Sequence, residues 1–85
     1  KTNVAIIDTL AWIESRLGNH ETALALFREA LVKDFDNAEI KYHLAVTLVA
    51  LARNVEAKKY LLEALESEQV FTERNDAKAL FLQLE

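Results

Sequence analysis

The chain repeats itself with a period of 34 residues, and this repeat limits its fold more than any other feature. Residues one period apart are apolar or small in both copies. The matching pairs are Leu10 with Leu44, Ala11 with Ala45, Leu17 with Leu51, Ala23 with Ala57, Phe27 with Leu61, Ala30 with Ala64 and Leu31 with Leu65. Similarity at a fixed period of this length is typical of architectures in which one supersecondary unit stacks on the next.

The composition indicates that these units are helical. The chain has no proline and a single glycine, Gly18, and 52% of its residues are hydrophobic. Such a composition favours helix almost throughout and is far from that of disordered chains. In the first unit, apolar residues recur at helical spacing, and they are Val4, Ile7, Leu10, Ala11 and Leu17.

Breaks in the apolar pattern place the helix boundaries. They predict five helices and no strand, near residues 3–17, 20–33, 37–51, 54–66 and 72–84. Gly18 can take the left-handed conformation that ends a helix. Side chains that can cap the later helices are Asn19 for the second, Asp36 or Asn37 for the third, Asn54 for the fourth and Thr72 for the fifth.

The order of small and large residues resembles that of the tetratricopeptide repeat family. The first copy supplies Ile7, Leu10, Ala11, Ala23, Phe27 and Ala30, and the second supplies Leu44, Ala45, Leu48, Ala57, Leu61 and Ala64. The resemblance implies an all-α, right-handed superhelix of two helix pairs and a C-terminal capping helix. We therefore expect one domain over 1–85, with repeats at 3–34 and 37–68 and the cap at 72–85.

The chain departs from the family pattern at particular positions. Ala52 stands where the second repeat would have glycine, and a left-handed alanine there costs about 1 kcal/mol. Glu14 stands where a large apolar residue is usual, so we expect its carboxylate to reach solvent or a hydrogen-bond donor.

A narrower resemblance rests on the segments 8–12, 16–18 and 42–45. They look like the C-terminal repeats of long bacterial tetratricopeptide proteins linked to exosortase (PEP-CTERM) and exopolysaccharide systems. Because the chain starts at Lys1 without a methionine, we expect a fragment of a longer protein. The compartment stays open between the cytoplasm and the bacterial cell envelope.

The charge pattern argues against several classes of partner. The net charge is −4, from 10 basic and 14 acidic residues that are interspersed along the chain. The Lys and Arg residues do not cluster into a basic surface that could bind phosphates, so nucleic acid is not an expected partner. No apolar run approaches the length of a membrane span, and there is no cysteine for disulfide or thiolate chemistry.

Two histidines, His20 and His43, are the only evident candidates for catalysis or metal binding. We find no His, Cys or carboxylate at ligand spacing from either, and interpret both as surface or groove residues. A lone glycine makes no phosphate loop. We therefore expect no catalytic residue, no metal ligand and no cofactor, and an enzyme is the least supported alternative.

The face that the resemblance assigns to ligands carries large apolar side chains. In this family the first helix of each pair lines the concave surface. The residues expected to bind a peptide there are Asp8, Trp12, Arg16, Tyr42, His43, Val46 and Val49. Aromatic anchors beside arginine are what binding hot spots use. A mostly apolar strip fits an amphipathic helix or an extended peptide of a partner protein.

Two alternatives stay open at this stage. Trp12 and Tyr42 can instead pack between adjacent first helices, leaving the chain as a purely structural end of a longer solenoid. The first helix is also apolar on more than one side, at Val4, Ile6, Ile7 and Ile13. Exposed apolar patches drive association, so a homodimer through exposed helix faces is the other alternative.

Overall fold

The computed structural model describes residues 3–84, and within this range it contains five α-helices and no strand. The helices are α1 (Val4–Arg16), α2 (His20–Lys33), α3 (Ala38–Ala50), α4 (Asn54–Glu66) and α5 (Arg74–Gln83). Each predicted boundary is met to within two residues, which confirms the all-α prediction. None of the described helices is long and apolar enough to cross a lipid bilayer.

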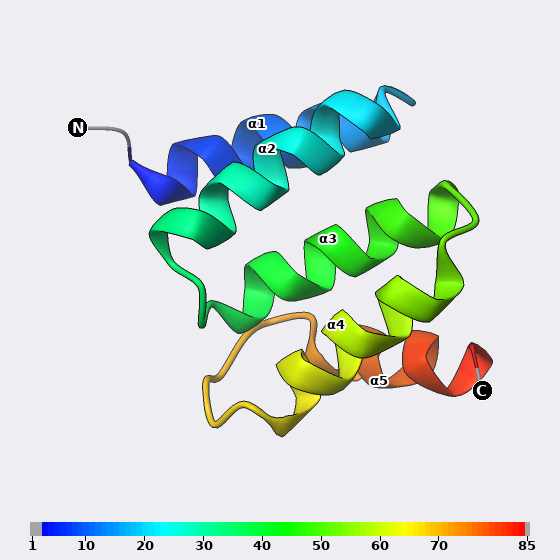
Figure 1. Cartoon of the computed structure of the whole chain (residues 1–85). Helices are drawn as coiled ribbons and strands as arrows, with labels where there is room; N and C mark the ends of the chain where they lie inside the picture. The colour runs from blue at the N-terminus through cyan, green and yellow to red at the C-terminus, as the bar shows by residue number, and fades with distance from the viewer. Residues whose placement is uncertain (1–2, 85) are drawn as a thin grey trace.

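The helices form a stack in chain order, from α1 and α2 through α3 to α4 and α5 (Figure 1). Consecutive helices pack against each other, and α1 also contacts α3. The six alanines of the repeat pattern are completely buried, and they are Ala11, Ala23, Ala30, Ala45, Ala57 and Ala64. Large side chains such as Phe27, Leu44 and Leu61 fill the space that these small residues leave between the helix axes.

Both helix pairs turn in the same way, one period apart. Gly18 has φ +89° and Ala52 has φ +60°, so the alanine adopts the left-handed conformation whose cost was given above. The N–H of Asn19 donates to the carbonyl of Glu14 at 2.9 Å, and the N–H of Arg53 donates to that of Leu48 at 2.8 Å. These bonds satisfy carbonyls that the end of a helix leaves free.

The helix caps follow the prediction only in part. Asn37 caps α3, since its side chain accepts from the N–H of Ile40 at 3.0 Å. Asn19 precedes α2, but its side-chain amide donates to Oε1 of Glu14 at 2.7 Å and makes no cap bond. The same bond confirms that Glu14 meets a donor.

The predicted caps of α4 and α5 were wrong. Arg53 occupies the cap position before α4, and Asn54 is already the first helical residue. Glu73 occupies the position before α5, one residue after Thr72. At α5, Phe71 is buried in the core just before the helix. A turn follows it, in which the N–H of Arg74 donates to the carbonyl of Phe71 at 3.2 Å, and the helix begins only after this turn.

One apolar stripe of α1 is exposed rather than buried. Leu10 and Leu17, expected to face the core, are 51% and 69% exposed. With Ile6 and Ile13, also exposed, they form what we term the α1 outer stripe. One period later the equivalent residues of α3 are Ile40, Leu44 and Thr47, which are buried, and Leu51, which is half-buried. The difference arises because α2 packs on α3, whereas no described helix covers the stripe on α1.

Candidate functional site

The predicted binding residues come from α1 and α3. Trp12, Tyr42, Val46 and Val49 are half-buried, so each keeps part of its side chain in solvent. Arg16 is exposed in the last turn of α1, and Asp8 is half-buried. His43 alone is buried, with 5% of its surface exposed. The predicted surface or groove position for His43 was therefore wrong.

Aromatic rings gather around His43. The ring of Trp12 stacks on the imidazole, with centroids 4.3 Å apart and planes at 27°. The ring of Tyr42 lies 5.7 Å from the imidazole and 6.3 Å from the ring of Phe71. Trp12 and Tyr42 thus help to hold α1, α3 and the segment before α5 together, as the packing alternative requires. Their half-exposed rings still present an aromatic surface.

His43 lies between carboxylates from two other parts of the chain. Its Nδ1 is 2.9 Å from Oδ1 of Asp8 on α1, and its Nε2 is 3.2 Å from Oε2 of Glu73 before α5. Glu39, one helical turn before His43 on α3, completes the group. We term these four residues the His43 cluster. The expectation that His43 has no carboxylate at ligand spacing was wrong.

The charges in the cluster shift the pKa values of its members. Burial lowers the pKa of His43, but the hydrogen bonds and charges of Asp8 and Glu73 outweigh it, so the pKa lies above 6.5. Burial, then the nearby carboxyl group of Glu73, raises the pKa of Glu39. Burial and the charges of Asp76 and Glu73 raise the pKa of Tyr42.

The segment after α4 places Glu73 against His43. Gln69 ties this segment to the start of α3, since its Oε1 accepts from the N–H of Ala38 at 2.8 Å. Its Nε2 donates to the carbonyl of Asp36 at 2.7 Å. Gln69 stands where the family pattern has proline, and proline could make neither bond. No local sequence pattern identified this link, because its partners lie more than 30 residues away.

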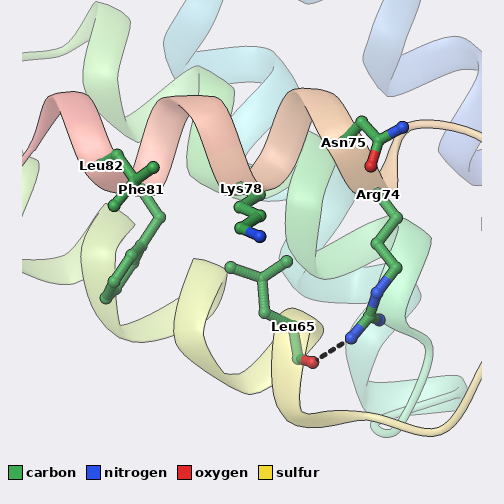
Figure 2. A pocket seen from close by; sticks show the side chains of 6 residues that line it. All are labelled: Leu65, Arg74, Asn75, Lys78, Phe81 and Leu82. Atoms are coloured by element: carbon green, nitrogen blue, oxygen red, sulfur yellow. Dashed lines mark hydrogen bonds between the residues drawn. The ribbon is translucent and has the colours of Figure 1, made fainter.

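A hollow of about 440 Å³ lies between α4 and α5, away from the predicted residues (Figure 2). Its lining residues are Leu65, Arg74, Asn75, Lys78, Phe81 and Leu82. The guanidinium of Arg74 donates to the carbonyl of Leu65, the bond drawn in Figure 2. The ammonium of Lys58 lies 5.9 Å from the ring centroid of Phe81. Arg74 thereby closes the carboxyl end of α4, a structural role for one of the basic residues here.

Comparison with known proteins agrees with this architecture. A family model for the tetratricopeptide repeat matches residues 16–81, which is more than half of the chain. No curated protein and no solved structure gives a significant match. The matched region runs from the end of α1 into α5 and includes both helices of the second pair. The chain belongs to the tetratricopeptide repeat family, whose repeats are non-catalytic scaffolds that generally mediate protein–protein interaction.

Proposed function

We propose that the chain is a binding scaffold, not an enzyme, and that it holds a peptide or amphipathic helix of a partner protein. The binding strip consists of Trp12, Tyr42, Val46 and Val49, with Asp8 and Arg16 at its edges. The observation that carries the proposal is the pair of half-exposed aromatic rings packed over a buried imidazole. Large aromatic anchors of this kind dominate the energy of protein interfaces.

The positions of these residues on α3 support a single face. Tyr42, Val46 and Val49 are spaced by four and three residues, so they share one side of the helix. That side points away from Leu44, which is buried in the core. The strip therefore lies on the side of α3 opposite Leu44, where Trp12, Tyr42 and Val49 pack against the core with only part of each side chain.

The rings are held in place before a partner arrives. Stacking on His43 orients Trp12, and the imidazole is itself fixed by Asp8 and Glu73. A side chain that is already ordered loses less conformational entropy on binding. A mostly apolar strip with Arg16 exposed at one end suits a partner segment with an apolar face and an acidic residue.

The experiment is capture of partners from the source organism, followed by calorimetry with the partner segment. Trp12→Ala and Val46→Lys should each weaken binding about thirtyfold or more, which corresponds to roughly 2 kcal/mol. Val32→Ala on α2 is the control, because Val32 is 85% exposed and lies outside the strip.

Circular dichroism and thermal melting establish which variants are folded. Val46→Lys is the decisive one, because it changes the strip without opening the stack over His43. Unchanged affinity in folded Trp12→Ala and Val46→Lys would move the binding site elsewhere on the chain.

The α1 outer stripe supports a second candidate, in which this face packs on another helix pair. Its equivalents on α3 are covered by α2, so a helix with an α2-like surface would fit it. That helix can belong to a further repeat or to a second molecule. The finer resemblance to exosortase-linked repeat proteins, and the division into two repeats and a cap, stay predictions.

A further inference from the structure

We propose that Glu39, His43 and Glu73 form a site for a divalent transition-metal ion such as Zn²⁺, with Asp8 orienting the imidazole. The inference goes beyond partner binding, because the site lies beneath the strip rather than on it.

The spacing of the ligand atoms suits one ion. Each of the three residues offers one ligand atom, and these atoms lie within 4.8 Å of one another. Nε2 of His43 and Oε2 of Glu73 are 3.2 Å apart. Ligands at 2.0–2.2 Å from a tetrahedral Zn²⁺ are about 3.3–3.6 Å apart, so this pair is already in position. The third oxygen, on Glu39, lies within 4.8 Å of these two atoms and would have to move closer to bind the same ion.

Asp8 completes a pattern that recurs around bound metals. A carboxylate only accepts hydrogen bonds, so the 2.9 Å contact places a proton on Nδ1 of His43. By the same rule the 3.2 Å contact with Glu73 places a hydrogen on Nε2, and a metal ion would displace this proton to take the Nε2 lone pair. Metal-binding histidines commonly donate their other N–H to a carboxylate in this way.

The charge of the His43 cluster favours a cation. When ionised, the carboxyl groups of Asp8, Glu39 and Glu73 place three negative charges around one imidazole. Even a protonated His43 would leave the cluster with an excess of about two negative charges.

A buried oxygen without a partner points to the same place. The carboxyl groups of Glu39 and Glu73 lie close enough to share a proton. Apart from that proton, Oε1 of Glu73 is shielded from solvent and has no hydrogen-bond partner among the described residues. The side chain of His43 is 6% exposed and that of Glu73 26%, so the ligand set surrounds a buried imidazole and is half-buried at its acids. A metal ion bound by Glu73 would compensate this oxygen, which otherwise loses its hydration without replacement.

The donor set indicates the class of metal. One imidazole nitrogen and two carboxylate oxygens suit Zn²⁺ and related first-row ions, whereas Ca²⁺ and Mg²⁺ prefer oxygen ligands alone. The site joins α3 to the residue that precedes α5, with Asp8 linking it to α1. Bound metal would therefore fasten the last helix to the stack.

The test is calorimetric titration of the chelator-treated chain with ZnCl₂ at pH 7 in a buffer without phosphate. We expect one ion per chain. The melting midpoint should rise by about 10 °C or more when free Zn²⁺ exceeds the dissociation constant about 100-fold. An equal response to CaCl₂ or MgCl₂ would contradict the assignment to a transition metal.

Variants separate metal binding from folding. Glu39→Gln preserves side-chain shape and removes a repelling negative charge, so it should melt at or above the wild-type temperature without metal. Glu73→Gln keeps an oxygen that can accept from Nε2 of His43, so it should stay folded and lose no more stability than Asp8→Asn. Both should lower Zn²⁺ affinity at least tenfold, and Asp8→Asn about 10- to 100-fold. The controls His20→Gln and Glu68→Gln should bind as the wild type does.

Three results would overturn the proposal. One is the absence of heat and of any melting shift up to millimolar ZnCl₂. Another is wild-type affinity in Glu39→Gln and Glu73→Gln, which would place the ion elsewhere. Loss of binding in His20→Gln would likewise assign it to the other histidine.

Discussion

The imidazole of His43 donates its Nδ1 hydrogen to Oδ1 of Asp8 over 2.9 Å, and this bond joins α3 to α1. Both side chains are largely removed from solvent, with 6% of His43 and 18% of Asp8 exposed. Together with the stacked ring of Trp12, the bond connects the first helices of the two pairs directly. The hydroxyl groups of Ser15 and Thr47, which are buried and 3.2 Å apart, join the same two helices.

Asp8→Ala should lower the free energy of unfolding by about 2 kcal/mol, because it leaves a buried imidazole nitrogen without its charged acceptor. Asp8→Asn should cost less, since the amide oxygen can still accept the bond. Urea denaturation in the presence of a chelator measures both changes free of any bound metal. Equal losses in the two variants would mean that packing, rather than the hydrogen bond, sets the cost.

The two inter-helix turns give a matched pair of substitutions. Ala52→Gly should stabilise the chain by about 0.5–1 kcal/mol, because it removes left-handed strain of about 1–2 kcal/mol but adds unfolded-state entropy. Gly18→Ala should destabilise by about 1 kcal/mol. A Cβ at Gly18 would have no atom within 4 Å, so this cost is conformational. Thermal melts that rank the variants the other way would contradict this account.

Much of the fold could be predicted because small and large residues occupy matching positions in the two repeats. Ala23 is a small buried residue and Phe27 a large one, and the positions one period later carry a small and a large buried residue again, Ala57 and Leu61. The expected burial of Leu10 was wrong because burial depends on neighbouring helices as well as on residue type. Leu44, one period later, is covered by α2, whereas no described helix covers Leu10.

Only part of the His43 cluster could be predicted from the sequence. Glu39 lies four residues before His43, so its place on the same helical face could have been found from spacing alone. Asp8 and Glu73 are 35 and 30 residues away, and only tertiary packing brings them to the imidazole. Trp12 could be predicted as a binding residue because it is a large aromatic residue. Its stacking on His43 could not be predicted from the sequence, because it depends on how α1 packs against α3.

Glu56 gives a prediction on pH. Its carboxylate accepts from Nε of Arg53 at 2.7 Å and lies 3.7 Å from Arg28, and the hydrogen bond from Arg53 is the main cause that lowers its pKa. Because the pKa of Glu56 is lower in the folded chain than in the unfolded chain, the ionised carboxylate stabilises the fold at a pH above the unfolded pKa near 4.5. This stabilisation is lost as the pH falls through the pKa of the folded chain. Carboxyl NMR should show a midpoint below 4.5.

Substitution separates the two arginines. Arg53→Gln should raise the titration midpoint of Glu56 more than Arg28→Gln does, because the Arg53 contact is shorter and hydrogen-bonded. The reverse order would assign the shift to the pair between α2 and α4 instead.

The last prediction concerns the α1 outer stripe, whose four large side chains are each at least 49% exposed. Because contiguous apolar surface drives association, the chain should self-associate reversibly at high micromolar concentration in sedimentation equilibrium. Leu10→Lys should make it monomeric, since the charge would be buried in the contact. Val32→Lys on α2 should leave association unchanged, although Val32 is even more exposed. Both exposed sites should change stability by less than about 0.5 kcal/mol. A wild-type chain that stays monomeric, or a Leu10→Lys chain that associates as strongly, would remove this stripe as a contact between copies.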